Sequence, residues 1–171
     1  GIKFRLNTKV NAAKQDKGLV KLDLESALNG DNEVLESDVV LVAVGRQPLT
    51  KGFGLEELNV KYDERGSIIV DSNFKTSVDG IYAIGDVIPG PMLAHKAEED
   101  GIACVEAMAG NSGHVDYSLV PSVIYTSPEV ASVGETEEGL RARGAAFTVG
   151  KFRFLGNSRA RANGKLDGMV K

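Results

Sequence analysis

The sequence predicts an α/β fold, and three stretches carry this prediction. Apolar and polar residues alternate through much of residues 1–40, as they do in strands that have one solvated face. Residues 39–44 are apolar without interruption, which is typical of a central parallel-type strand covered on both faces. Between Ala94 and Ala109, small and apolar residues recur at intervals of three and four, which is the spacing of an amphipathic helix of about four turns.

Residues 1–40 are expected to form an antiparallel meander with one solvated face. Phe4 and Leu6 alternate with polar residues near the start, and Val20, Leu22 and Leu24 do so further along. The turns between the strands are marked by Gly, Asn and Asp. The expected elements are strands at residues 2–6, 10–13 and 19–25, turns at 16–18 and 29–32, and the start of a further strand at 34–35.

Gly45 follows the apolar stretch directly and opens the segment Gly45-Arg46-Gln47-Pro48. A glycine at the carboxyl end of a buried strand lets a ligand or another backbone approach closely. A tight turn that needs a positive φ is the alternative, and these residues alone leave both interpretations open.

Residues 80–84 are expected to form a short buried strand that ends at Asp86, just before a Gly/Pro turn and the long helix. A carboxylate in this place, beside a helix N-terminus, suits a hydroxyl-bearing ligand whose polarised part faces the helix. The alternative is that Asp86 only forms the turn or caps the helix. Upstream, residues 55–60 are expected to form a short amphipathic turn that runs into a strand, and a surface turn is expected at 63–66, before Ser67-Ile68-Ile69-Val70.

The long helix is expected to end at Gly110 in a left-handed cap. Cys104 lies in its apolar pattern, and a buried packing role is favoured over a catalytic thiol because Lys96 is the only cation nearby in sequence. The acidic residues of the helix are expected mostly outside the apolar stripe; they are Glu98, Glu99, Asp100 and Glu106.

Shorter elements are expected after residue 116. Thr136 precedes two glutamates, as an N-cap does when acidic residues occupy the first helical turn, and this helix should end near Gly144. Further strands are expected at residues 122–125, 130–133 and 147–154, with another beginning at the end of the chain. Domain boundaries are placed near Pro48 and near Asp116.

Composition excludes several classes of function. A net charge of −4 with interspersed signs gives no basic stripe for a nucleic acid and no polybasic patch for a membrane surface. No apolar run is long enough to cross a bilayer. One cysteine allows no internal disulfide, and with only His95 and His114 beside it no metal site is expected. The chain lacks an initiator methionine and a targeting segment, so we expect an internal fragment.

Three segments together resemble the pyridine nucleotide-disulfide oxidoreductases: the strand ending in Val44-Gly45-Arg46-Gln47-Pro48, then residues 80–86, then residues 120–129. Their order and spacing make the resemblance more specific than any one motif, and it runs the whole length of the chain. Within the family, residues 90–99, Gly-Pro-Met-Leu-Ala-His-Lys-Ala-Glu-Glu, resemble the dihydrolipoamide dehydrogenase type.

The resemblance implies a fragment of a multi-domain FAD- and NAD(P)-binding flavoprotein. Residues 1–48 would end the NAD-binding domain, 49–116 would belong to the FAD-binding and central part, and 117–171 would begin the dimer-interface domain. Gly45 and Val10 would lie close to NAD. Asp86 would accept a hydrogen bond from the ribityl chain of FAD. Backbone N–H groups would face the flavin ring from Met92, Leu93, Ala94 and His95, with the His95 imidazole only packing or capping.

The implied activity is the oxidation of protein-bound dihydrolipoamide, with electrons passed through a disulfide and FAD to NAD⁺. No catalytic residue is identified, because the redox-active cysteine pair and the His-Glu pair of the family are missing from this sequence. The isolated chain is therefore expected to be inactive. The implied partners are a second copy and the lipoyl domains of 2-oxo acid dehydrogenase complexes or of the glycine cleavage system.

Alternatives stay open at this point. A sister reductase of the mercuric or glutathione type would share most of these segments, and a non-catalytic nucleotide-binding module would fold alone and bind no flavin. The resemblance to eukaryotic members implies the mitochondrial matrix, while a bacterial cytoplasm is equally compatible with a single cysteine.

Overall fold

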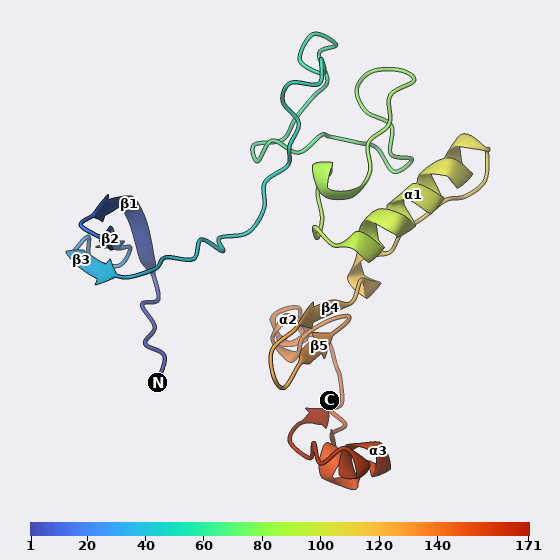
Figure 1. Cartoon of the computed structure of the whole chain (residues 1–171). Coiled ribbons are helices and arrows are strands. Elements are labelled where there is room, and N and C mark those ends of the chain that lie inside the picture. The colour runs from blue at the N-terminus through green and yellow to red at the C-terminus, as the bar shows by residue number, and fades with distance from the viewer. The chain divides into compact units, whose positions relative to one another are not determined.

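The computed structural model describes all residues, 1–171, and they form two compact units, Gly1–Gly45 and Arg46–Lys171. Figure 1 traces both units along the chain. Each is described by itself below. No helix combines the length and the apolar character that crossing a bilayer requires.

The first unit is a three-stranded antiparallel sheet in the order β1-β2-β3, which confirms the predicted meander (Figure 1). Its strands are β1 (Thr8–Asp16), β2 (Leu19–Ser26) and β3 (Asn32–Ser37). Lys17 and Gly18 turn the chain between β1 and β2 with φ values of 50° and 89°. Leu24 of β2 is the buried apolar residue of this sheet.

The strand predicted at residues 2–6 is wrong, because this stretch is irregular and the first strand begins at Thr8. Phe4 and Leu6 are 77% and 78% exposed. Their alternation has no sheet face to cover, since β2 pairs with residues 8–16 and not with the chain before them. Within this stretch, Arg5 forms an ion pair of 2.6 Å with Glu33 of β3.

The central strand predicted at residues 39–44 is also wrong. The segment is irregular, and Leu41 and Val44 are 87% and 92% exposed. A strand that is apolar on both faces needs neighbouring strands and covering layers. The three-stranded sheet ends at β3, and none of its strands pairs with this segment.

The second unit begins with a long irregular stretch before helix α1 (Ala94–Met108), drawn in Figure 1 without strands. Its predicted strands reduce to two isolated bridges, Tyr62 with Ile68 and Lys75 with Tyr82. The surface turn at residues 63–66 is confirmed, because the Asp63 carboxylate accepts from the N–H groups of Arg65 and Ser67 at 2.9 and 2.8 Å. Side-chain acceptors thus replace strand pairing here.

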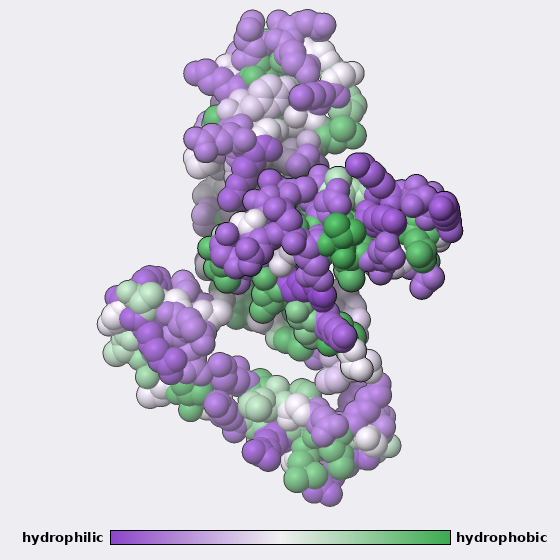
Figure 2. Space-filling model, turned by 90° about the vertical axis from the view of Figure 1, so that its left-hand side faces the viewer, coloured by the Kyte–Doolittle hydropathy of each residue, from purple (hydrophilic) through white to green (hydrophobic).

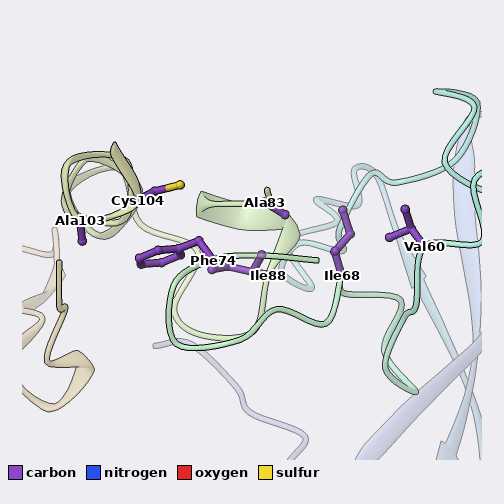
Figure 3. Packing of buried hydrophobic residues seen from close by; sticks show 7 residues of the cluster. All are labelled: Val60, Ile68, Phe74, Ala83, Ile88, Ala103 and Cys104. Carbon is purple, nitrogen blue, oxygen red and sulfur yellow. The ribbon is translucent and has the colours of Figure 1, made fainter. Parts of the chain in front are cut away.

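One apolar cluster joins this irregular stretch to α1. Figure 3 shows its seven buried residues, which are Val60, Ile68, Phe74, Ala83, Ile88, Ala103 and Cys104. The last two project from α1, so the helix covers the loops that precede it. The helix ends as predicted, with Gly110 at a φ of 82°.

Cys104 is 4% exposed and packs in this cluster, which confirms the predicted structural role. Burial, followed by the charge of Asp100, raises the pKa of its thiol. The reactive thiolate is therefore disfavoured.

The rest of the unit consists of short elements. Strands β4 (Ser122–Ile124) and β5 (Val130–Ser132) pair antiparallel, and β6 (Phe152–Arg153) pairs with β7 (Met169–Val170). Thr136 caps α2 (Glu137–Ala142) by accepting from the Gly139 N–H, as predicted.

Of the strand predicted at residues 147–154, only β6 forms, because these two residues alone pair with another strand, β7. Helix α3 (Ser158–Ala162), capped by Asn157, was not predicted. Many apolar residues of these short elements stay at the surface. Figure 2 shows one face of the molecule, on which hydrophobic (green) and hydrophilic (purple) residues are interspersed.

Candidate functional site

Asp86 lies in a single 3-10 turn, η1 (Gly85–Val87), which packs against α1. Gly85 has a φ of 72°, a conformation that glycine adopts without strain, and this turns the chain just before the carboxylate. A Cβ at Gly85 would lie 3.2 Å from the Cβ of Ala97, so the turn approaches the helix closely. The predicted acidic residue beside a helix start is therefore present, at the end of an irregular segment in place of a strand.

The Asp86 carboxylate caps neither helix. The residue before η1 is Ile84, which offers no side-chain acceptor, and the residue before α1 is Leu93, which offers none either. The side chain of Asp86 is 45% exposed, and its one charged neighbour is the Arg46 guanidinium, with Nε 3.8 Å from Oδ2. Because this ion pair is long and the carboxylate is partly exposed, Asp86 can still accept a hydrogen bond from a ligand.

The first turn of α1 offers donors of its own. Leu93 is extended, with φ −130° and ψ 137°, and no side chain caps the N–H groups of Ala94, His95 and Lys96. Uncapped N–H groups and the positive end of the helix dipole together favour an anionic or polarised oxygen at this point. Met92 and Leu93, just before this turn, are partly buried.

His95 uses its imidazole for an internal contact. Its Nε2 lies 2.9 Å from the carbonyl oxygen of Pro121, which precedes β4. The ring thus ties the start of α1 to the next segment of the chain, while the backbone of His95 belongs to the uncapped first turn. The structure therefore gives the imidazole a contact within the chain.

The sequence reasoning missed a fully buried ion pair beneath this site. Lys96 and Asp100 are both 0% exposed, and Nζ lies 2.8 Å from Oδ2. Lys96 Nζ also donates to the carbonyl oxygen of Gly85 at 2.9 Å, and the Gly85 N–H donates to Asp100 Oδ2 at 3.0 Å. The acidic residues Glu98, Glu99 and Glu106 are exposed, as expected, and Asp100 is the exception.

A signal for this pair was available in the helical spacing. Lys96, Asp100, Ala103 and Cys104 stand at i, i+4, i+7 and i+8, which places all four on one helix face. A Lys/Asp pair at i and i+4 usually belongs to a solvated face. Its position in line with two core residues could have identified the exception.

Tyr117 contacts both members of the Lys96–Asp100 ion pair. Its hydroxyl donates to Asp100 Oδ1 at 2.8 Å, and its ring centroid lies 5.3 Å from Lys96 Nζ. Burial, then the hydrogen bond to Asp100 and its charge, raises the pKa of Tyr117. The phenol therefore stays protonated and acts as a donor.

The residues predicted near NAD, Val10 and Gly45, belong to the first unit. Val10 is in β1, paired with Leu24, at the point where a bulge shifts the register before Ala12. Gly45 follows the irregular segment with a φ of 100°, and open space surrounds the place where its Cβ would be. No group of three or more His, Cys, Asp or Glu side chains is arranged to hold a metal ion.

The Asp86 carboxylate and the uncapped first turn of α1 together indicate which ligand would fit. The Asp86 carboxylate accepts from hydroxyl groups, and the first turn of α1 donates to a carbonyl oxygen or an electron-rich ring edge. A flavin carries both, because a polyhydroxylated chain is attached to a ring with an oxygen- and nitrogen-bearing edge. The residues present therefore fit FAD.

Known proteins are similar to this chain along its whole length. The family model described as pyridine nucleotide-disulphide oxidoreductase matches residues 1–101, and the model of the dimerisation domain of the same family matches residues 120–171. Mitochondrial dihydrolipoyl dehydrogenase from Homo sapiens is 56% identical over 172 aligned positions, which cover 100% of this chain and 34% of that protein. Leghemoglobin reductase from Vigna unguiculata is 57% identical, with 100% and 33% covered.

Solved structures give the same picture of the fold. LpdA from Mycobacterium tuberculosis matches with a TM-score of 0.82 at 25% identity, over 95% of this chain and 35% of that one. The HOCl-induced flavoprotein disulfide reductase RclA from Escherichia coli matches with a TM-score of 0.76 at 27% identity, over 94% and 36%. The chain spans about a third of the length of the relatives it matches. It belongs to the pyridine nucleotide-disulphide oxidoreductase family.

Proposed function

We propose that this chain is part of a dihydrolipoyl dehydrogenase and that its second unit contributes to the binding of FAD. The observation that carries the proposal is the 56% identity with human mitochondrial dihydrolipoyl dehydrogenase along the whole chain. The free acceptor of Asp86 and the uncapped start of α1 support the same conclusion from chemistry.

Asp86 would hold FAD by accepting a hydrogen bond from its ribityl chain. Backbone N–H groups between Met92 and His95 would face the flavin ring. Bound FAD supplies the two-electron relay between a dithiol and NAD⁺. The positive end of α1 favours excess negative charge on the neighbouring ring edge, so these residues would make the flavin a better electron acceptor.

NAD would be bound by the first part of the chain, close to Gly45 and Val10. The glycine has a φ of 100° and no neighbour in the space where a side chain would stand, which would let a ligand come close. In this proposal residues 1–48 belong to an NAD-binding domain, 49–116 to an FAD-binding and central segment, and 117–171 to a dimer-interface domain.

The full-length protein would oxidise protein-bound dihydrolipoamide to lipoamide and reduce NAD⁺. It would act as a homodimer, supported by the dimerisation-domain match. Its protein substrates would be the lipoyl domains of 2-oxo acid dehydrogenase complexes or of the glycine cleavage system. The mitochondrial relatives from animals and plants favour the mitochondrial matrix over a bacterial cytoplasm.

The test is a steady-state assay of the full-length protein with dihydrolipoamide and NAD⁺. We expect NADH to form together with lipoamide, in equal amounts. The name of the Vigna unguiculata relative favours a second candidate, reduction of leghemoglobin. Turnover of ferric leghemoglobin with NADH at a kcat/KM above that for dihydrolipoamide would contradict the first proposal and favour the second.

A further inference from the structure

Lys96 and Asp100 together bind both backbone polar groups of Gly85. Lys96 holds the carbonyl oxygen of Gly85 at 2.9 Å, and Asp100 holds its N–H at 3.0 Å. The peptide groups before and after the Gly85 Cα are therefore both fixed by charged hydrogen bonds from α1. Asp86 is the next residue, so its direction is set by these two contacts.

The surrounding packing leaves this arrangement little freedom. A Cβ at Gly85 would lie 3.2 Å from Ala97, and a Cβ at Gly90 would lie 3.1 Å from Cε of Lys96. The turn from Gly85 to Gly90 thus wraps around the aliphatic part of Lys96. The same helix that offers its free N–H groups also carries the two charges that hold the turn.

Stability alone does not account for the pair. Two charges with 0% exposure lose their hydration, and an apolar pair of similar volume often stabilises a core as well or better. An apolar pair could not hold the N–H and the carbonyl oxygen of Gly85. What the charges add is a fixed position for the turn relative to the first turn of α1.

We propose that Lys96 and Asp100 are positioning residues for FAD binding: they fix the Asp86 carboxylate relative to the uncapped N–H groups of α1. This inference rests on the proposed function. Neither side chain contacts solvent, and each acts on the ligand only through Gly85 and Asp86. Tyr117, which donates to Asp100 at 2.8 Å, completes the support of the pair.

A double-mutant cycle in the full-length protein tests the proposal. The dissociation constant of FAD is measured by adding FAD to the apoprotein of D86A, of K96M/D100L and of the triple variant. Loss of one hydrogen bond to a charged group corresponds to about a 10- to 100-fold weaker affinity. We expect D86A and K96M/D100L each to weaken binding by about this factor, and the triple variant to be no weaker than D86A.

The double replacement is chosen because it leaves no unpaired buried charge. D100N gives a second route: it keeps the shape of the side chain and an acceptor for the Gly85 N–H, but it leaves the buried Lys96 ammonium without a countercharge and so lowers stability more. Because the hold on Gly85 is only partly lost, we expect a smaller loss of FAD affinity than in K96M/D100L, and this loss should also vanish when D86A is present. The matched control is E98Q on the exposed side of α1, which should bind FAD like the unmodified protein. Thermal unfolding of each apoprotein separates affinity from stability.

The outcomes distinguish this inference from the proposed function. If D86A weakens FAD binding but K96M/D100L and D100N do not, the positioning role is overturned while the proposed site stands. Losses that multiply in the triple variant would also overturn it, because they mean that the pair acts independently of Asp86. If D86A binds FAD normally, the proposed cofactor role of Asp86 itself fails.

Discussion

Replacing Lys96 by methionine should destabilise the protein far more than replacing both members of the ion pair. In K96M the Asp100 carboxylate stays buried with two donors, the Gly85 N–H and the Tyr117 hydroxyl, and loses its countercharge. Breaking a fully buried pair in this way costs about 3–5 kcal/mol. No discount for solvent applies, because both side chains are 0% exposed.

In K96M/D100L the uncompensated charge is gone. The main loss that remains is at the buried Gly85 N–H, whose acceptor is removed, at about 1–3 kcal/mol for a buried unsatisfied donor. The hydroxyl of Tyr117, which is only partly buried, also loses this acceptor. The Gly85 carbonyl oxygen keeps the N–H of Ile88 at 3.3 Å. The double variant should therefore be more stable than K96M by about 2 kcal/mol.

Equilibrium urea unfolding of the full-length apoproteins, followed by far-ultraviolet circular dichroism, measures these differences. E98Q, on the same helix but exposed, is the control and should unfold like the unmodified protein. The reasoning is refuted if K96M loses less than about 1 kcal/mol, or if the double variant is less stable than K96M.

Three further predictions concern the same region. G85A should lose at least about 1 kcal/mol, because its φ of 72° strains an L-residue and its Cβ would lie 3.2 Å from Ala97; an unchanged free energy of unfolding would contradict this. Because the pKa of Tyr117 is raised in the folded protein, stability should fall as the pH rises above about 10, where unfolded tyrosine ionises, and urea unfolding of Y117F should show a shallower fall. Cys104 should react with iodoacetamide at pH 8 far more slowly than after unfolding in urea, and equal rates would refute its burial.

Features governed by neighbours in sequence could be predicted from the sequence. The cap at Thr136, the left-handed Gly110 and the turn at Lys17-Gly18 depend on a few adjacent residues, and the structure has all three. The antiparallel meander could be predicted because apolar and polar residues alternate along its strands. The prediction failed at residues 2–6, because β2 pairs only with residues 8–16.

Features that need distant partners could not be predicted in this way. The apolar residues 39–44 fit a covered strand, yet pairing depends on strands elsewhere, and this structure brings none to them. Asp86 could be named as a candidate from its place before the helix, and its role stays a prediction. The buried charges of Lys96 and Asp100 were missed because composition and average helix patterns assign such pairs to the surface.

The FAD content of the D86A protein tests the central claim most directly. Full-length protein carrying D86A is purified beside D79A, which removes an exposed carboxylate seven residues earlier, and FAD per protein is read from the absorbance near 450 nm. We predict that D79A keeps the flavin content of the unmodified protein and that D86A loses most of it during purification. Equal flavin content in D86A and D79A would contradict the assignment of this turn and the start of α1 to the flavin.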